Sequence, residues 1–313
     1  MTITETRPLT KGPVMRLDDM NLSVGKRARL YSLLYQHGPA NGTMMFLPID
    51  QGLEHGPRDF FVNPAAADPE FELRLSHGGN FTGIVYQIGI ASKYMYQYAG
   101  KVPLVLKLNG KTEIPSDTQP LSPLLAGVED AVRLGALAVG YTLYVGSAMQ
   151  TEDFKQFALV RKEAEAMGMP IIVWSYPRGE FVEAKGGKDS FYAIDYAARV
   201  AAEAGADVIK VNVPKVGLPQ EKLGKMPKEY VQANSEMSQE DATRAVVHAG
   251  GRSFMLFSGG EKESDVDLVH KARLAMDAGA TGLIFGRNMW QRPMEDALSM
   301  ARQMSELLQE YSA

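Results

Sequence analysis

The stretch AGADVIKVNVPK, residues 204–215, holds the features that decide the fold. Gly205 ends the helical pattern that precedes it, because glycine suits the left-handed conformation at a helix C-terminus. The run that follows is short and rich in β-formers, which is typical of a buried strand in a parallel sheet. Lys210 interrupts this apolar run, and a lysine is almost never fully buried without a partner or a function.

The same unit of helical pattern, small-residue stop and apolar run recurs along the chain. Further copies are LGALAVGYT (134–142), MGMPIIVWSY (167–176), AGGRSFMLFSGG (249–260), AGATGLIFG (278–286) and, more loosely, GGNFTGIVY (78–86). MMFLPID (44–50) and VPLVLKLN (102–109) bring the predicted strands to eight. Eight strands alternating with helices over about 250 residues predict an α/β fold, a single closed (β/α)₈ TIM barrel. The alternative, an open doubly wound sheet, usually carries a glycine-rich fingerprint after its first strand, and this chain has none there.

The segments between these runs are predicted to be helices. Residues 190–205 and 264–279 each open with a serine that suits an N-cap. Residues 151–168 carry apolar side chains close to a 3.6-residue period. Those side chains are Phe154, Phe157, Ala158, Val160, Ala164 and Met167.

The barrel is predicted to occupy residues 44–313 as the catalytic domain. Residues 1–43 are expected to form an N-terminal extension with one helix at 23–38, packing under the barrel or over its mouth. The polar stretch 214–238, rich in Pro and Lys, is interpreted as an insertion after the sixth strand. It would lie on the side of the barrel where active sites are built.

The bulk composition fits an ordinary globular protein. Of 313 residues, 45% are hydrophobic and 22% charged, enough for a sizeable core. A net charge of −4 gives no electrostatic footprint for nucleic acid. The absence of cysteine excludes disulfides and thiolate chemistry. We expect no signal peptide in MTITETRPLTKG and no membrane span, and therefore a cytoplasmic protein.

Strand alternation predicts which side chains enter the barrel. The inward groups are Val208, Lys210 and Asn212 on the sixth strand, Val105, Lys107 and Asn109 on the third, and Ile172, Trp174 and Tyr176 on the fifth. Asp50 closes the first strand. Polar groups therefore gather at the carboxyl ends of the strands, where catalysis occurs in this fold.

The two inward lysines suggest covalent chemistry. Repulsion between ammonium groups and desolvation both lower a lysine pKa, and a neutral amine can attack a carbonyl to form a Schiff base. The alternative is that each lysine pairs with a neighbouring Asp or Glu. Strand parity does not decide whether Lys107 or Lys210 is the nucleophile.

A phosphate site is predicted after strands seven and eight, where SGGEKES (258–264) and GRNMW (286–290) follow. Glycines let backbone N–H groups approach an anion, and arginine adds a charged fork. The candidates are Ser258, Gly259, Gly260, Gly286 and Arg287. Ordinary turn glycines are the alternative interpretation.

Metal chemistry is not expected from this sequence. None of its five histidines lies at a spacing such as H-x-x-x-H. The pair Glu54-His55 is more typical of a loop hydrogen-bonding element than of a metal ligand.

Seven motifs in order give a resemblance that covers residues 48–293. They are PIDQGLEHGP, VLKLNGKT, GYTLYVGS, VWSYPRG, ADVIKVNV, SGGEK and GRNMWQRP. Together they resemble the archaeal-type class I fructose-bisphosphate aldolases, which also occur in bacteria. Archaeal members typically read D-H-G where this chain has Asp50-Gln51-Gly52, and bacterial relatives carry Gln there too.

The resemblance implies a metal-independent aldolase without cofactor. It would cleave fructose 1,6-bisphosphate reversibly into dihydroxyacetone phosphate and glyceraldehyde 3-phosphate. By this resemblance Lys210 forms the imine, Tyr176 passes protons, and Asp50 handles the hydroxyl proton at the cleaved bond or tunes the intermediate.

The resemblance also implies binding roles and an assembly. Lys107 matches a second active-site lysine, Trp174 lines the site, and the SGG and GR segments bind the phosphate of the ketone half. Arg178 and the insertion are suggested for the phosphate of the aldehyde half. A homo-oligomer is expected. A related Schiff-base lyase or thiolase acting on another phosphorylated ketose, a non-catalytic phosphosugar-binding barrel and a flavin-binding barrel are the alternatives.

Overall fold

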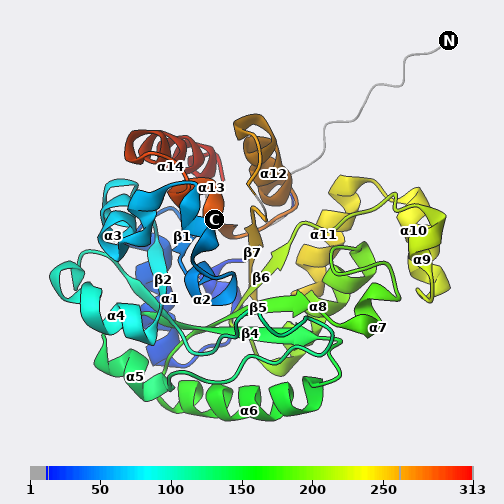
Figure 1. Ribbon diagram of the computed structural model, residues 1–313, viewed down its shortest axis with the longest axis horizontal. Coiled ribbons are helices and arrows are strands. Elements are labelled where there is room, and N and C mark those ends of the chain that lie inside the picture. Colours follow the sequence, from blue (N-terminus) through cyan, green and yellow to red (C-terminus); the bar gives the residue numbers. More distant parts are fainter. Residues whose placement is uncertain (1–11, 13, 261, 312–313) are drawn as a thin grey trace.

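Eight parallel strands form a closed barrel in the computed structural model, which describes residue 12, residues 14–260 and residues 262–311. Each strand pairs with the next along the chain, and β8 pairs with β1. They are β1 (Met44–Pro48), β2 (Gly83–Gln87), β3 (Leu104–Lys107), β4 (Ala138–Val145), β5 (Ile171–Pro177), β6 (Val208–Asn212), β7 (Phe254–Ser258) and β8 (Gly282–Ile284). The predicted (β/α)₈ barrel is confirmed, with helices around the ring of strands (Figure 1).

Helices that follow the strands form the outer layer. The longer ones are α3 (Pro69–Gly78), α4 (Ile88–Tyr94), α5 (Val128–Arg133), α6 (Gln150–Ala166), α8 (Phe191–Ala204), α11 (Gln239–Ala249), α12 (Asp265–Asp277) and α14 (Met294–Gln309). Short helical turns are η1 (Leu17–Asp19), α2 (Gln51–Glu54), η2 (Pro57–Phe61), η3 (Pro64–Ala67), η4 (Met95–Tyr98), α7 (Glu180–Glu183) and α13 (Arg287–Trp290). Throughout the described residues, no helix combines the length and apolarity needed to cross a bilayer.

The stretch after β6 contains two helices of its own. They are α9 (Gln220–Leu223) and α10 (Lys228–Glu236), and α10 reaches back to bind α8 through the hydrogen bond from Tyr230 Oη to Asp195, 2.6 Å long. Figure 1 shows both helices extending outward beyond α8 and α11. This polar stretch therefore forms a helical insertion on the outside of the barrel.

Strand alternation sorts the side chains as predicted. Ile209 and Val211 belong to the buried cluster between strands and helices, whereas Val208 belongs to a second cluster inside the barrel. The inner cluster also holds Trp174 and Val105. Both faces of each strand are thus buried, which explains why the strands read as nearly continuous apolar runs.

The two predicted helix caps are confirmed, but the predicted apolar face of one helix is only partly correct. Ser190 and Ser264 cap α8 and α12 by accepting hydrogen bonds from backbone N–H groups, as predicted. On α6 the expected apolar face is partly wrong. Its buried side chains are Asp153, Phe157, Val160 and Ala164, while Phe154, Ala158 and Met167 are exposed. Buried Asp153 takes part of that face because it accepts hydrogen bonds from the Tyr141 hydroxyl and the Tyr144 backbone N–H.

The N-terminal helix α1 (Val24–Tyr35) closes the amino-terminal end of the barrel. Its Leu30, Leu33 and Leu34 are buried in the inner cluster. Lys26 Nζ lies 3.0 Å from the Asp207 carboxylate, just before β6, and 2.9 Å from Glu165 at the end of α6. Of the two positions expected for this helix, the one under the barrel is the one observed, and the mouth stays free for the site.

Replacing Lys26 by methionine should destabilise the fold strongly. The Asp207 side chain is 8% exposed, so the variant would leave its charge buried without its main partner. Removing one member of a buried ion pair typically costs about 3–5 kcal/mol. Urea denaturation at pH 7 measures this loss. Lys155→Met, which breaks an exposed pair with Glu152, should cost less than about 1 kcal/mol. Equal unfolding midpoints for the two variants would contradict a structural role for Lys26.

Candidate active site

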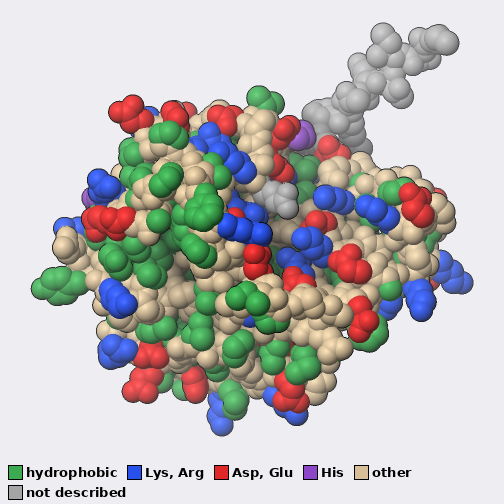
Figure 2. Space-filling view, viewed as in Figure 1, with side chains coloured by type: hydrophobic (Ala, Val, Ile, Leu, Met, Phe, Trp, Pro, Cys, Tyr) green, Lys and Arg blue, Asp and Glu red, His purple; other side chains and the backbone are tan. Residues whose placement is uncertain are grey.

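A cavity of about 810 Å³ opens at the carboxyl ends of the strands. Every predicted site residue except Lys107 lines it: Asp50, Trp174, Tyr176, Arg178, Lys210, Ser258, Gly259, Gly260, Gly286 and Arg287. Lys107 lies just beneath, with no exposed surface. Basic and acidic side chains stand together around the hollow at the centre of this face (Figure 2). The structure thus brings residues from four strands and the loops between them into one enclosed space.

Lys210 projects from β6 into the bottom of this cavity. It is 5% exposed, and its ammonium nitrogen contacts the Tyr176 hydroxyl at the end of β5. The same nitrogen lies 4.3 Å from the centre of the Tyr176 ring. Burial lowers the pKa of Lys210 to about 7, although Asp50 and Glu54 act in the opposite direction. At neutral pH a large share of this amine is therefore unprotonated.

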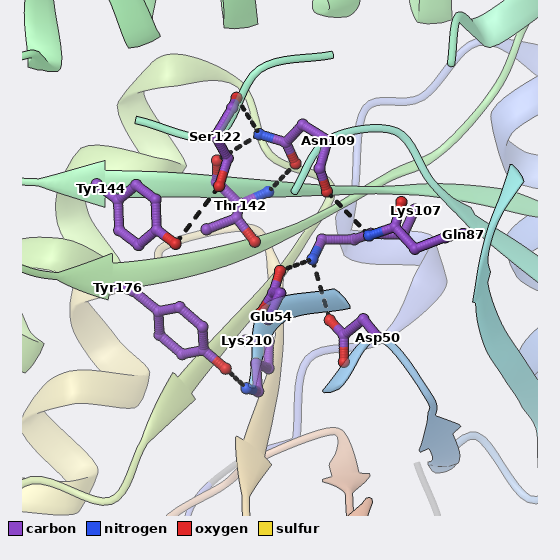
Figure 3. A network of polar contacts seen from close by, with 10 residues as sticks. All are labelled: Asp50, Glu54, Gln87, Lys107, Asn109, Ser122, Thr142, Tyr144, Tyr176 and Lys210. Carbon is purple, nitrogen blue, oxygen red and sulfur yellow. Dashed lines mark hydrogen bonds and ion pairs between the residues drawn. The ribbon is translucent and has the colours of Figure 1, made fainter. Parts of the chain in front are cut away.

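Lys107 behaves differently, which corrects the expectation that both lysines would have lowered pKa values. Its Nζ lies 3.0 Å from Asp50 and 2.9 Å from Glu54, between the two carboxylates (Figure 3). Burial alone would lower the Lys107 pKa, but the two carboxylates raise it above the ordinary lysine value. Lys107 is therefore a fixed cation, whereas Lys210 is the lysine of lowered pKa in this cavity.

The two carboxylates also differ from each other. Burial acts to raise the pKa of Asp50, but the charges of Lys107 and Lys210 outweigh it, so that pKa is lowered. For Glu54 burial dominates, and its pKa is raised. Both carboxyl groups contact Lys107, but their pKa values are shifted in opposite directions. The pair can therefore hold a proton on Glu54 beside a negative charge on Asp50. In the sequence Glu54 stands out only as the neighbour of His55, and no local pattern indicates that α2 turns Glu54 toward Lys107 on β3.

Polar groups at the ends of β3 and β4 fix the wall beside Lys107. The Asn109 amide donates to the Thr142 carbonyl over 2.8 Å, and the Thr142 backbone N–H donates to the Asn109 side chain over 2.7 Å. Asn109 also donates to the backbone carbonyl of Ser122, and the side-chain hydroxyl of Ser122 contacts the Tyr144 hydroxyl (Figure 3). Asn109 thus faces its neighbouring strand and binds the chain that follows β3, rather than the cavity.

The predicted anion loops meet on the β7 and β8 side. Gly260 has a φ of +72°, which favours glycine, and a Cβ on Gly259 would approach the Asn288 amide nitrogen to 2.8 Å. Arg287 donates to the Gly260 carbonyl over 3.2 Å, and Ser258 donates to the Asn212 side chain. The backbone conformation thus favours glycine at position 260, neighbouring side chains crowd position 259, and the hydrogen bond to Gly260 keeps the guanidinium at the rim of the cavity.

Basic side chains lie over the aromatic rings of β5. The Arg178 guanidinium lies 5.0 Å from the centre of the Tyr176 ring, and Lys107 Nζ lies 4.9 Å from the Trp174 ring. Trp174 is 1% exposed, lines the cavity and pairs in register with Lys210 on the neighbouring strand. Arg178 also approaches Asp117, with 3.7 Å between Nε and Oδ2.

The acidic side chains here hold a lysine instead of forming a metal-ligand set. Among the described residues, no group of three or more His, Cys, Asp or Glu side chains is placed to bind a metal ion. Asp50 and Glu54 both accept hydrogen bonds from the Lys107 side-chain nitrogen.

Comparisons with known proteins agree with this geometry. The model of the DeoC/LacD family aldolases matches residues 44–292. A curated relative from Thermoproteus tenax, "Fructose-bisphosphate aldolase class 1", is 40% identical over 85% of this chain and 90% of its own length. One of the same name from Halobacterium salinarum is 36% identical over 80% and 86%.

Among solved structures, similarity extends to an archaeal fructose-1,6-bisphosphate aldolase whose catalytic lysine is covalently bound to the carbinolamine intermediate of its substrate. It is 37% identical, with a TM-score of 0.76 covering 90% of this chain and 99% of that one. The family model spans the whole barrel from β1 to the residues after α13. On this evidence the chain belongs to the DeoC/LacD family of aldolases.

Proposed function

We propose that this chain is a class I fructose-bisphosphate aldolase, with Lys210 as the imine-forming residue. The observation that carries the proposal is a buried amine of lowered pKa, in contact with a tyrosine hydroxyl and facing a cavity rimmed by anion-binding loops. A neutral amine is what attack on a ketone requires. Relatives in the same family are named for cleavage of fructose bisphosphate.

The amine of Lys210 would attack C2 of the ketose and form a carbinolamine. Loss of water gives a protonated imine, which draws electrons from the C3–C4 bond. As the C4 hydroxyl loses its proton, that bond breaks and its electron pair forms an enamine on the ketone half. Glyceraldehyde 3-phosphate leaves, C3 of the enamine takes up a proton, and water releases dihydroxyacetone phosphate and the free amine.

Proton transfers in this sequence fall to the groups around Lys210. Tyr176, whose hydroxyl touches the amine, is proposed to donate and accept protons at the reacting carbons. Asp50 is proposed to handle the proton of the C4 hydroxyl, since Lys107 holds its carboxylate toward the cavity and Glu54 shares that lysine. The tyrosine near the end of β4 is less suited, because the Tyr144 hydroxyl contacts Ser122 and not the amine.

Substrate positioning is proposed for the rim. Ser258, Gly259, Gly260, Gly286 and Arg287 would bind the phosphate of the ketone half and fix C2 beside Lys210. Trp174 would line the path of the carbon chain. We also infer a cytoplasmic homo-oligomer, which gel filtration with light scattering and cell fractionation would test.

Borohydride trapping with dihydroxyacetone phosphate tests the assignment of Lys210. The Lys210 peptide should gain the mass of the reduced ligand, and purified protein should cleave fructose 1,6-bisphosphate. Because the amine has a pKa of about 7, trapping should rise several-fold from pH 6 to pH 8 and then level off. For a lysine of ordinary pKa, the yield of trapping would still be rising near pH 10. Modification of Lys107 instead, or binding without trapping as in a non-catalytic sensor, would refute the proposal.

A further inference from the structure

Three hydrogen-bonded polar side chains line the β6 and β7 side of the cavity. Asn212 ends β6, two residues beyond Lys210, and pairs in register with Ser258 at the end of β7. The Asn212 side-chain nitrogen donates to Asp189 Oδ1 over 3.0 Å, and its side-chain oxygen accepts from the Ser258 hydroxyl. All three side chains belong to residues that line the cavity together with Lys210. They therefore connect the strand that carries the amine to the glycine loop that begins at Gly259.

Backbone hydrogen bonds hold Asp189 in this position. The Lys215 backbone N–H donates to the Asp189 carbonyl over 2.7 Å, and the Phe191 backbone N–H donates to the Lys215 carbonyl over 3.0 Å. The second carboxylate oxygen of Asp189 lies 3.6 Å from Lys215 Nζ. The start of α8 and the chain after β6 thus fix this carboxylate beside Asn212, with a cation on its other side.

The carboxylate determines the direction of both hydrogen bonds. An ionised carboxylate can only accept, so the part of the Asn212 amide that faces Asp189 has to be its NH₂ group. The oxygen of the same amide then faces Ser258, and that oxygen also can only accept. The one hydroxyl proton of Ser258 is used in this bond. Ser258 Oγ therefore offers a ligand only its lone pairs.

An oxygen that offers only lone pairs suits a hydrogen-bond donor and does not suit a phosphate. A phosphate monoester presents acceptor oxygens and most of two negative charges at neutral pH. To donate to it, Ser258 would have to break its bond to Asn212 at a position that is only 7% exposed, which costs free energy. The single hydroxyl of dihydroxyacetone phosphate, on C3, is in contrast a donor that this oxygen can accept from.

We propose that Ser258 accepts a hydrogen bond from the C3 hydroxyl of the ketone half, and that Asn212 and Asp189 are positioning residues that keep Ser258 an acceptor. C3 is bonded to the carbon that would join Lys210, so the contact would be made beside the reacting atom. The site would thereby select ketones that carry a hydroxyl at C3. This inference rests on the proposed aldolase function and narrows the role given there to Ser258.

The test compares two ketone phosphates by borohydride trapping. Hydroxyacetone phosphate has the same ketone and phosphate as dihydroxyacetone phosphate, but a hydrogen replaces the C3 hydroxyl. Ser258→Ala should raise the half-saturating concentration of dihydroxyacetone phosphate by about fivefold, as expected for loss of one neutral hydrogen bond. The half-saturating concentration of hydroxyacetone phosphate and the inhibition constant of inorganic phosphate should each change less than about twofold.

Asp189→Asn tests the direction of the hydrogen bonds without removing the Ser258 hydroxyl. An amide at this position can donate as well as accept, so the Asn212 amide can turn over and release the Ser258 proton. The preference for dihydroxyacetone phosphate over hydroxyacetone phosphate should fall by about twofold or more. Glu203→Gln makes the same carboxylate-to-amide change in an exposed pair on α8 and should leave this preference unchanged.

Several results would overturn the proposal. Equal weakening of both ketones and of inorganic phosphate in Ser258→Ala would show that the hydroxyl donates to phosphate. Equal weakening of both ketones alone would place the contact at the oxygen on C2. An unchanged preference in Asp189→Asn would show that the carboxylate does not set the direction of the bonds. Urea midpoints of both variants, expected near that of the unmodified protein, confirm that trapping is measured on folded protein.

Trapping by the unmodified protein separates this proposal from the proposed function. If the unmodified protein traps neither ketone, the aldolase proposal fails and this inference fails with it. If it traps dihydroxyacetone phosphate at Lys210 and Ser258→Ala keeps the same preference, only the role of Ser258 is refuted.

Discussion

Lys210→Met should abolish borohydride trapping with dihydroxyacetone phosphate and reduce cleavage of fructose 1,6-bisphosphate by about 10⁴-fold or more. Methionine keeps most of the side-chain volume but removes the nitrogen that would bond to C2. Losing a covalent nucleophile removes a whole reaction path rather than one contact, so effects of this size are usual. The control is Lys155→Met, whose lysine lies exposed on α6 and should keep full activity. Cleavage within tenfold of the unmodified protein would remove Lys210 from the mechanism.

The same variant should fold at least as well as the original protein. The pKa of Lys210 is lowered in the folded state, so its charged form is disfavoured there relative to the unfolded chain. This penalty is complete below pH 7 and diminishes as the pH rises from about 7 toward the ordinary lysine value of about 10.5. Urea midpoints of Lys210→Met should therefore equal or exceed those of the original protein at pH 7, with the gap narrowing at higher pH. A marked loss of stability would show that the missing activity reflects misfolding.

The strands could be predicted because their signals are local. A small-residue stop with glycine followed by a short apolar run marks six of the eight, and alternation then sorts Lys210 and Val208 from Ile209 and Val211. These signals arise because both faces of each strand are buried, so nearly every residue of the strand is apolar. The glycines after β7 also reflect local requirements, since Gly260 has a φ of +72° and the side chains of Asn288 and Phe285 lie close to Gly259.

What separates the two lysines could not be predicted in this way. Both lie on inward parity, but only Lys107 has Glu54 beside it, and that contact depends on the direction in which α2 leaves β1. The same limit applies to Asp117, which lines the cavity from the chain between β3 and α5, where there is no helix or strand. Buried Asp153 on α6 gave no sequence signal either, because its partners Tyr141 and Tyr144 come from β4. Contacts between elements determine these charges, and no local pattern encodes them.

Tyr176→Phe should preserve the imine while slowing turnover by about 10²–10⁴-fold, the range typical of a lost general acid–base group. The ring of phenylalanine can keep the packing against Arg178 and Lys210, since both cations lie over the ring face. Only the hydroxyl that contacts Lys210 is lost. Two measurements divide the reaction: the amount of trapped Lys210 peptide, which should stay near the original level, and steady-state cleavage, which should fall.

The matched control for this change is Tyr31→Phe, which removes an exposed hydroxyl on α1 at the opposite end of the barrel. It should alter neither readout. If trapping falls in parallel with cleavage in Tyr176→Phe, the hydroxyl acts by positioning or activating the amine, and proton transfer at carbon belongs to another group. If trapping persists while cleavage falls, the hydroxyl acts after the imine has formed. Because the contact between Lys210 and Tyr176 permits both roles in space, this difference between the two readouts is what assigns the proton transfer.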